Sequence, residues 1–510
     1  MTGNKVNISD LKQSIKSKVP SEIIESAKEL NCELYVVGGA VRDCILGLPI
    51  KDIDFSVVGD VNALTEDIVK RQGSGKVSFY QRYGTALVQF DGNQFEFATS
   101  REESYSPESR KPSQVSSVPI ERDLKRRDFT INTLALGIVG SRSGELIDLF
   151  DGVDDLKQGI IKTPLEPNKT FSDDPLRMLR AIRFAAELGF YIVPETWEGI
   201  KENASRIDIV ALERIGDEFL KMVAGSDPVN AIMLLIDSGL MEKFIPEINR
   251  LGGVEQVGKH HHKDVLKHTM KVMQNVIDVS SDPILRLSAL FHDIGKPRTK
   301  RFYPKQGWTF HGHEVVGERM TQKIGRRIHI GKSDLNRLTK LVGLHMRPIN
   351  LTSEGVTDSA IRRLMVDCSD DIDSQLILCR ADITTANPKL VTRYLANFDE
   401  IKVRMDKVLA KDKMREFQSP LRGDEIMKIC CIEPGPLVGA LKGRIEDAIL
   451  EGEISYDIEA ATEYLMKIKD EVLTTDVKKI KQDGIVRSRH RNNISNELSV
   501  PEITARIGGD

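Results

Sequence analysis

The sequence has few cysteines, few aromatic residues and no long apolar run. Its six cysteines form no CxxC pair and show no framework spacing, which indicates reduced thiols rather than a disulfide scaffold. No segment reaches the roughly 18 apolar residues of a membrane helix. The first residues, MTGNKVNISDLKQ, lack the apolar core of a signal peptide. We therefore expect a cytoplasmic protein that has no membrane partner.

The charge shows no large excess of either sign. Lys and Arg number 73 against 76 Asp and Glu, so the formal net charge is −3. A chain this balanced exerts no global attraction on nucleic acid, and any RNA contact must come from local basic patches. The 40% hydrophobic, 29% charged and 5% aromatic residues are typical of a helix-rich soluble protein.

Length and periodicity indicate several domains of two kinds. A chain of 510 residues is too long for one hydrophobic core, so three or four domains are expected. β-branched segments predict strands at 34–37, 53–58, 85–90 and 95–98, whereas almost everything after Phe171 has helical spacing. The Ser-, Pro-, Glu- and Arg-rich stretch 102–118 is expected to form a loop. The pattern predicts an α+β head followed by an all-α body.

A pair of carboxylates one residue apart, Asp52 and Asp54 in KDIDFSV, is the most informative feature. On an extended strand these side chains point to the same face and can present oxygens to one cluster of hard cations. The preceding segment, VVGGAVRD, places Gly38 and Gly39 between a buried strand and a helix, where backbone amides can approach a polyphosphate. The combination predicts a two-metal site for attack on a nucleotide α-phosphorus. Glu96 is either a third acid near the metals or an ordinary strand carboxylate.

Three blocks in order carry a family resemblance. GGAVRD followed by DID, KRRDFTIN at 125–132 and FSDDPLRMLRAIRF at 171–184 resemble the class II tRNA nucleotidyltransferase and poly(A) polymerase family. The resemblance covers roughly residues 30 to 390. It implies a DNA polymerase β-like mixed sheet with helices in the head, Mg²⁺ held by Asp52 and Asp54, and tRNA, CTP and ATP as partners.

The resemblance and the periodicity together suggest six segments. We expect an N-terminal helical extension at 1–29, the nucleotidyltransferase head at 30–160, and a helical neck and body for nucleotide selection and RNA binding at 161–255. An HD domain is expected at 256–390, a helical tail that contacts tRNA at 391–475, and a basic, flexible tail at 476–510.

Polar side chains of the three blocks are candidates for binding the nucleotide. An Arg guanidinium matches a pair of phosphoryl oxygens, although an Arg127–Asp128 salt bridge is a structural alternative. A carboxylate only accepts and an Arg only donates, so Asp174 with Arg177 can pair with C or A and reject U and G. The family places Glu-Asp-x-x-Arg here, and Asp173 is one methylene shorter. The arginines repeated every third residue contact phosphate or form a solvated basic face. The predicted nucleotide-binding set is Gly38, Gly39, Arg42, Arg127, Asp128, Asn132, Asp173, Asp174, Arg177 and Arg180.

A second metal site is predicted further along the chain. The run LSALFHDIGKP places His292 and Asp293 at the end of an apolar helix. Imidazole and carboxylate donors from several helices suit a transition metal such as Mn²⁺, Ni²⁺ or Fe²⁺. The segment resembles the HD phosphohydrolase superfamily, which implies the ligands His268, His292, Asp293 and Asp382. His313 and His345 are candidates for a second metal or a phosphate.

The sequence therefore predicts a Mg²⁺-dependent enzyme that adds CMP, CMP and AMP to tRNA 3′ ends and carries an auxiliary HD phosphohydrolase. A poly(A) polymerase is the near alternative, because the head motifs barely distinguish the two. An HD phosphohydrolase with the head as a binding module is an alternative of another class, against which the intact Asp52 and Asp54 argue. The sequence makes no prediction of the oligomeric state.

Overall fold

The computed structural model describes residues 8–80, 84–106, 109–257, 262–305, 307–351, 357–384, 387–416, 419–451 and 453–474. These divide between two compact units, Met1–Gly343 and Leu344–Asp510, and each is described by itself. The predicted basic tail at 476–510 lies outside the described residues. Within the described ranges, no helix combines the length and the apolar character needed to cross a bilayer.

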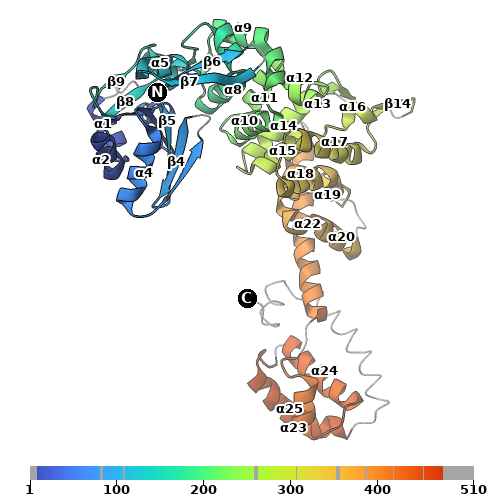
Figure 1. Cartoon of the computed structure of the whole chain (residues 1–510). Helices are drawn as coiled ribbons and strands as arrows, with labels where there is room; N and C mark the ends of the chain where they lie inside the picture. Colours follow the sequence, from blue (N-terminus) through green and yellow to red (C-terminus); the bar gives the residue numbers. More distant parts are fainter. Residues whose placement is uncertain are drawn as a thin grey trace. The chain divides into compact units, whose positions relative to one another are not determined.

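A seven-stranded mixed sheet organises the N-terminal part of the first unit (Figure 1). Its strand order is β3-β4-β5-β2-β1-β8-β9, and β2 and β5 are the parallel pair among antiparallel neighbours. The strands of the sheet are β1 (Glu33–Val37), β2 (Ile53–Val58), β3 (Lys76–Tyr80), β4 (Thr85–Phe90), β5 (Asn93–Thr99), β8 (Ala135–Val139) and β9 (Leu146–Ile147). The four predicted strands are confirmed as β1, β2, β4 and β5.

Aromatic side chains fix the face that β2 presents to the core. Phe55 is fully buried and stacks on Phe97 of β5, with ring centroids 4.8 Å apart. Full burial of a phenylalanine side chain stabilises the folded state by about 1.5–3 kcal/mol relative to leaving it exposed. Since side chains alternate along a strand, this packing turns Asp54, which precedes Phe55, to the opposite face. The hydrophobic register of β2 thus sets the direction of the acidic pair.

Short helices surround this sheet. They are α1 (Ile8–Lys16), α2 (Ser21–Glu29), α3 (Gly39–Ile45), α4 (Val61–Gln72), α5 (Ile120–Lys125) and the 3₁₀ turn η2 (Thr130–Asn132). Capping residues mark both ends of α4. The Asp60 carboxylate accepts from the Asn62 amide at 2.9 Å at the N-terminus, and Gly73, with φ +71°, ends the helix.

The stretch 102–118 is a β-hairpin, so the loop prediction was wrong. β6 (Arg101–Ser106) pairs antiparallel with β7 (Ser109–Ser117). These strands lack the alternation of apolar and polar residues on which strand prediction depends. Their backbone amides and carbonyls still satisfy one another across the hairpin, because ladder bonds do not require apolar side chains.

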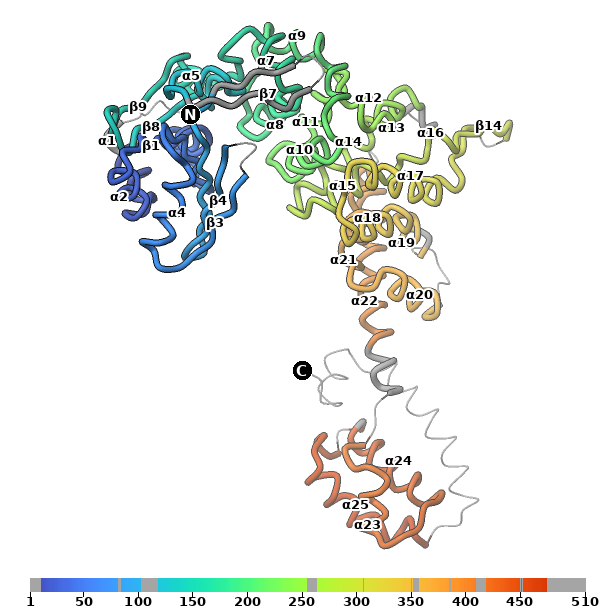
Figure 2. The backbone as a smooth tube through the Cα atoms, in the orientation of Figure 1, coloured from blue at the N-terminus to red at the C-terminus, as the bar shows by residue number. Residues whose placement is uncertain are grey.

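The rest of the first unit is mainly helical, and α8 packs against α10 and α11 (Figure 2). Its helices are α6 (Gly152–Gln158), α7 (Pro167–Asp173), α8 (Leu176–Leu188), α9 (Pro194–Asn203), η3 (Ala204–Ile209), α10 (Leu212–Ala224), α11 (Pro228–Asp237), α12 (Met241–Phe244), α13 (Pro246–Asn249), α14 (Val265–Ile277), α15 (Pro283–Phe291), α16 (Lys296–Thr299), α17 (His313–Arg327) and α18 (Lys332–Leu344). Three two-stranded pairs accompany them: β10 (Ile160–Ile161) with β11 (Tyr191–Ile192), β12 (Glu255–Val257) with β13 (His262–Asp264), and β14 (Arg301–Tyr303) with β15 (Gly307–Thr309).

The described residues of the second unit are helical. The helices are α19 (Arg347–Asn350), α20 (Asp358–Cys368), η4 (Ser369–Asp371), α21 (Ile372–Ala381), α22 (Pro388–Glu416), α23 (Gly423–Cys430), α24 (Pro436–Glu451) and α25 (Ile458–Leu473). One buried cluster joins α20, α21 and α22, and a second joins α23, α24 and α25. The prediction of an α+β head followed by a helical body is confirmed.

Candidate active site and metal centre

The acidic pair lies at the start of β2. Asp52 directly precedes the strand, Asp54 is its second residue, and both are exposed. The parallel register places Asp54 opposite Glu96 of β5, so these two side chains share a face of the sheet. Incomplete hydration raises the pKa of Asp54, Arg127 opposes this, and Asp52 adds to the rise. Incomplete hydration and then Asp54 likewise raise the pKa of Glu96. Such a set of hard oxygen donors fits Mg²⁺.

The turn beside these acids requires glycine. Gly38 has φ +68°, and a Cβ there would lie 3.1 Å from Nη1 of Arg127. The Gly38 amide donates to the carbonyl of Leu134 at 3.0 Å, so it holds the turn against the sheet rather than pointing into a phosphate cradle. Gly39 begins α3, and a Cβ there would meet Nη2 of Arg42 at 3.7 Å. Gly38 therefore lets the Arg127 guanidinium approach the backbone of the turn, whereas a Cβ on Gly39 would make only an ordinary contact with Arg42.

Arg127 is anchored through one nitrogen and lacks a partner at another. Its Nη2 lies 3.2 Å from Oδ2 of buried Asp123, which also pairs with Arg126. The alternative Arg127–Asp128 salt bridge was wrong, because Asp128 pairs with Arg180. Among the described atoms, Nε of Arg127 is buried and has no hydrogen-bond partner. A phosphoryl oxygen would satisfy this donor.

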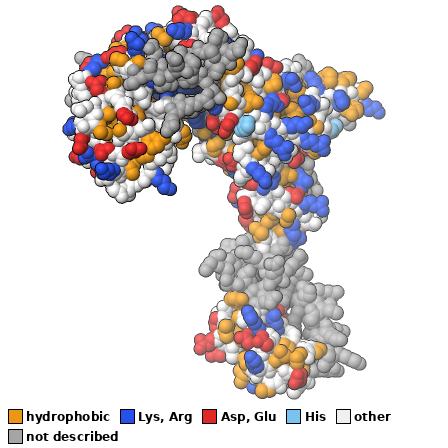
Figure 3. Space-filling model, viewed as in Figure 1, with side chains coloured by type: hydrophobic (Ala, Val, Ile, Leu, Met, Phe, Trp, Pro, Cys, Tyr) orange, Lys and Arg blue, Asp and Glu red, His pale blue; other side chains and the backbone are white. Residues whose placement is uncertain are grey.

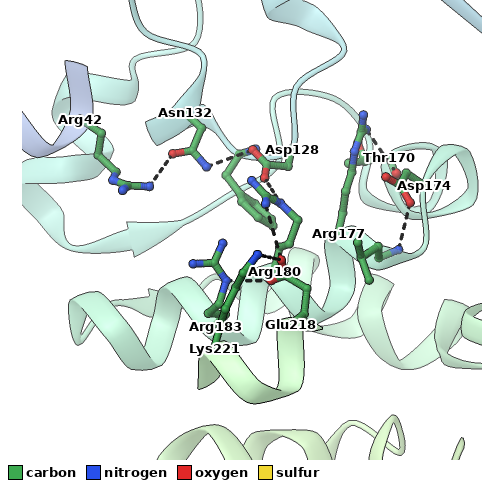
Figure 4. A network of polar contacts seen from close by, with 12 residues as sticks. Arg42, Asp128, Asn132, Thr170, Asp174, Arg177, Arg180, Arg183, Glu218 and Lys221 are labelled. Carbon is green, nitrogen blue, oxygen red and sulfur yellow. Dashed lines mark hydrogen bonds and ion pairs between the residues drawn. The ribbon is translucent and has the colours of Figure 1, made fainter. Parts of the chain in front are cut away.

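A chain of polar contacts links the head to α8 (Figure 4). Nη1 of Arg42 donates to Oδ1 of Asn132 at 2.9 Å, and Nδ2 of Asn132 donates to Oδ1 of Asp128 at 3.0 Å. Nε of Arg180 donates to Oδ2 of Asp128 at 2.8 Å. Burial alone would raise the pKa of Asp128, but the Arg180 charge and the hydrogen bond from Asn132 lower it to about 2. Asp128 thus stays ionised and orients both arginines.

The arginines of α8 are not a solvated basic face, so that alternative was wrong. Arg183 donates from Nε to Oε2 of Glu218 on α10 at 2.7 Å, and Nη1 of Arg180 lies 4.0 Å from Oε1. The guanidinium carbons of Arg183, Arg42 and Arg180 lie 4.3, 4.9 and 5.2 Å from the ring centroid of Phe184. Three guanidinium groups therefore gather around one aromatic ring, and two of them, those of Arg180 and Arg183, also reach the buried carboxylate of Glu218.

The block predicted to select the base spans the junction of α7 and α8. Asp173 ends α7, and Oδ1 of Asp174 accepts from the amide of Leu176, the first residue of α8, at 3.2 Å (Figure 4). Arg177 is 9% exposed, and its Nη2 donates to the carbonyl of Arg126 at 2.5 Å. Burial raises the pKa of Asp173, and Arg177 opposes this. In this geometry Arg177 ties α8 to the KRRD block; its contact with a base stays a prediction.

The second site brings together four of the predicted ligands in the first unit. Nε2 of His268 lies 3.3 Å from Nε2 of His292, and both nitrogens lie within 3.4 Å of Oδ2 of Asp293. Nε2 of His313 lies 3.5 Å from Oδ1 of the same carboxylate. Nζ of Lys296 also reaches Asp293, at 2.7 Å. Burial would raise the pKa of Asp293, but His292 and Lys296 hold it well below its ordinary value.

Backbone contacts set the tautomers of this cluster. Nδ1 of His292 lies 2.8 Å from the Ala289 carbonyl, and Nδ1 of His313 lies 2.9 Å from the Phe310 carbonyl. Since a carbonyl only accepts, each Nδ1 carries a proton, and Nε2 is the nitrogen left to bind a metal. Burial lowers the pKa of His313, which keeps its ring neutral. In each ring the Nδ1 bond to a backbone carbonyl directs Nε2 toward Asp293. Histidines held in this way fit a divalent transition metal.

His345 and Asp382 belong to the second unit. His345 is 1% exposed, and its carbonyl accepts from the Cys379 thiol at 2.9 Å. Asp382 is the residue that ends α21. Their part in the ligand set stays a prediction.

Sequence reasoning missed four supporting residues: Asp123, Phe184, Glu218 and Lys296. Asp123, Glu218 and Lys296 each gave a local signal, since a residue of opposite charge lies three residues away along the chain, a spacing of helical ion pairs, whereas Phe184 gave none.

Comparison with known proteins agrees with this arrangement. Models of the "Poly A polymerase head domain", the "Probable RNA and SrmB- binding site of polymerase A" and the "HD domain" match residues 34–162, 189–251 and 265–387. An A-adding tRNA nucleotidyltransferase of Deinococcus radiodurans is 30% identical over 437 residues, which cover 83% of this chain and 93% of that one. The chain belongs to the class II tRNA nucleotidyltransferase and poly(A) polymerase family.

Other members of the family match over a shorter span. A CCA-adding enzyme of Ligilactobacillus salivarius is 38% identical over 240 residues, which cover 47% of this chain and 56% of that protein. The chain spans about half the length of this and several other curated relatives. Solved structures share the fold: the Bacillus stearothermophilus CCA-adding enzyme with CTP gives a TM-score of 0.53 at 23% identity, covering 90% of this chain and 98% of that one. The Thermotoga maritima CCA-adding enzyme complexed with tRNA_CCA gives 0.54 at 20% identity, with the same coverage.

Proposed function

We propose that this chain is a Mg²⁺-dependent tRNA nucleotidyltransferase that adds CMP, CMP and AMP to tRNA 3′ ends from CTP and ATP. The observation that carries the proposal is the acidic set Asp52, Asp54 and Glu96 beside the Gly38 turn and the Arg127 guanidinium, whose Nε has no partner among the described atoms. Named relatives that add CCA or A to tRNA support it. Cytoplasmic location follows from the same proposal, because the substrate is tRNA.

The chain's residues have distinct roles in the proposed reaction. The 3′ oxygen of the RNA forms a bond to the α-phosphorus, the bond from that phosphorus to the β-phosphate oxygen breaks, and pyrophosphate leaves. Mg²⁺ held by Asp52 and Asp54 would lower the pKa of the attacking hydroxyl and neutralise the leaving group. Arg127 and Arg42 bind phosphoryl oxygens, and Asp128 orients Arg42 through Asn132. Asp174 with Arg177 selects the base edge, with Asp173 as the adjacent carboxylate.

The deciding experiment supplies tRNA lacking its 3′ end together with each labelled triphosphate. We expect two CMP and one AMP to be incorporated, and a poly(A) polymerase would instead extend the RNA repeatedly from ATP alone. Asp52→Ala and Asp54→Ala should each reduce incorporation by orders of magnitude, because a metal-binding carboxylate is lost. Asp154→Ala, which removes an exposed carboxylate of α6, is the matched control and should retain it. Near-parental incorporation by Asp54→Ala would contradict the two-metal site.

A second activity is proposed for the histidine cluster. The inward Nε2 atoms of His292 and His313 around Asp293 favour a metal-dependent phosphohydrolase that removes terminal or 2′,3′-cyclic phosphates from RNA ends. His268 and Asp382 complete the proposed ligand set, with His345 as a further ligand. Replacing His292 and Asp293 with Ala should remove bound metal and phosphatase activity together, while CTP and ATP incorporation continues. Loss of incorporation on an intact tRNA would show instead that the metal supports the whole fold.

A further inference from the structure

A short β-hairpin lies in the chain between two residues of the histidine cluster, Asp293 and His313. The chain leaves the cluster after Asp293, forms β14 and β15, and re-enters it at His313, the first residue of α17. The two ends of the insertion touch: a Cβ on Gly295 would lie 2.2 Å from the carbonyl oxygen of His313. Only glycine allows this approach, so the base of the hairpin is fixed against the proposed metal ligands.

The hairpin exposes an aromatic pair on one face. Phe302 is 60% exposed and Trp308 is 38% exposed, and the register places them directly opposite each other. Their ring centroids lie 5.2 Å apart at an interplanar angle of 66°. Nζ of Lys300 lies 4.5 Å from the centroid of Trp308, on the same face. Large rings this accessible to water are costly in a monomer and indicate a binding surface.

The insertion is also strongly basic. Residues 294–313 contain no Asp or Glu, and they contain five Lys or Arg residues in a chain whose net charge is −3: Lys296, Arg298, Lys300, Arg301 and Lys305. Lys296 is held by Asp293, whereas the other four lie on or beside the hairpin. In the space-filling view, hydrophobic and basic atoms dominate the end of the first unit that carries β14 (Figure 3). The surface therefore favours an anionic partner that also has flat apolar faces.

We propose that the face formed by Lys300, Phe302 and Trp308 binds an unpaired RNA 3′ end and guides its terminal phosphate to the histidine cluster. Bases stack on exposed aromatic rings whatever their sequence, and cationic side chains neutralise the backbone. Five residues of chain from Trp308 to His313 span at most about 17 Å. With about 3.4 Å per stacked nucleotide, the rings can hold a base no more than about five nucleotides from the end. The hairpin thus selects single-stranded ends for the phosphohydrolase, which deepens the function proposed above and rests on it.

The size of the surface distinguishes RNA from a protein partner. An aromatic side chain buries at most about 250 Å², so the pair offers about 500 Å². A stable protein interface needs about 800 Å² on each side. A base, in contrast, needs one ring face and one nearby cation, which this hairpin provides.

The test uses the full-length protein carrying Trp197→Phe, which leaves Trp308 as the only tryptophan because the chain has two. The probe is an unpaired oligonucleotide of six residues with a 3′ phosphate. We expect it to quench Trp308 fluorescence, and a blunt duplex of the same sequence not to. Anisotropy of a labelled oligonucleotide should show that Phe302→Ala combined with Trp308→Ala weakens binding by roughly tenfold or more. Tyr303→Ala, which removes an equally accessible ring from the opposite face, is the matched control and should bind like the parent.

The kinetic readout separates positioning from chemistry. Removing the ring pair should raise the KM for 3′-phosphorylated RNA by a similar factor and leave kcat unchanged. If the histidine cluster has no hydrolase activity, the proposed phosphohydrolase fails while quenching and anisotropy still report the RNA contact. Equal loss in Tyr303→Ala, equal binding of the duplex, or quenching by anionic vesicles without quenching by the oligonucleotide would each overturn the RNA assignment.

Discussion

Asp128→Asn is the sharpest test of how the head is joined to the helical body. The substitution keeps the shape of the side chain and removes the charge that holds Arg180 and Asn132. The ordinary pKa of 3.8 falls to about 2 in the folded protein. At about 1.36 kcal/mol per pH unit, that difference amounts to about 2.4 kcal/mol of stability at pH 7. We expect the free energy of unfolding of the first unit to fall by about 2–3 kcal/mol.

The pH dependence gives the prediction its sign. A carboxylate whose folded pKa is depressed stabilises the fold above its unfolded pKa, and this contribution is lost as the pH falls through the folded value. The penalty of Asp128→Asn should therefore be constant from pH 7 to about pH 5. It should shrink to about half at pH 3, where the parent's carboxylate is mostly protonated in the unfolded state but still ionised in the folded state, so that folding must release a proton.

Urea titrations followed by Trp197 fluorescence in a Trp308→Phe background provide the measurement, since Trp197 lies on α9 of the first unit. Asp154→Asn is the control: Asp154 forms an exposed pair with Lys157, and such pairs contribute about 0–1 kcal/mol. A penalty for Asp128→Asn that is the same at pH 3 and pH 7, or no larger than that of Asp154→Asn, would refute the assigned role of the charge.

Three further predictions concern the turn, the arginine cluster and the cysteines. Gly38→Ala and Gly47→Ala should each cost about 1–2 kcal/mol because both have positive φ, but only Gly38→Ala should impair nucleotide addition, since only there would the Cβ meet Arg127. Glu218→Gln should lower the unfolding free energy by about 3 kcal/mol and Glu187→Gln by less than about 1, because only Glu218 is buried against Arg183. Burial raises the pKa of the Cys379 thiol, so a thiol reagent should modify exposed Cys431 first and Cys379 only on unfolding, as mass spectrometry of the labelled peptides would report.

The sequence predicted those parts of the fold that follow from local pattern. β1, β2, β4 and β5 were recognisable from their apolar, β-branched residues. The hairpin of β6 and β7 was missed because SRKPSQVSS contains a single large apolar residue, and only pairing with a neighbouring strand makes it extended. Strand existence there is a property of the pair rather than of the segment.

The site divides in the same way. The acids of β2 and the histidine cluster could be predicted, because carboxylates and imidazoles at such spacings are the residue types that bind metals. The partner of Asp128 could not be predicted, because Arg180 lies 52 residues later in the chain. Nothing in the sequence distinguishes Arg180 from the neighbouring arginines as that partner. Phe184 was equally hidden: an apolar residue in an amphipathic helix predicts core packing, not a ring approached by three guanidinium groups.

The strand order of the sheet has a consequence for how the protein is made. β1 has β2 on one side and β8 on the other, and Val37 of β1 pairs with Ala135, about 100 residues later in the chain. At a synthesis rate of about 5–20 residues per second, β1 and β2 must wait on the order of 5–20 s on the ribosome before β8 arrives. During that interval one edge of the nascent sheet is open, directly beside the strand that carries Asp54. A ribosome stalled before residue 135 therefore exposes an aggregation-prone edge.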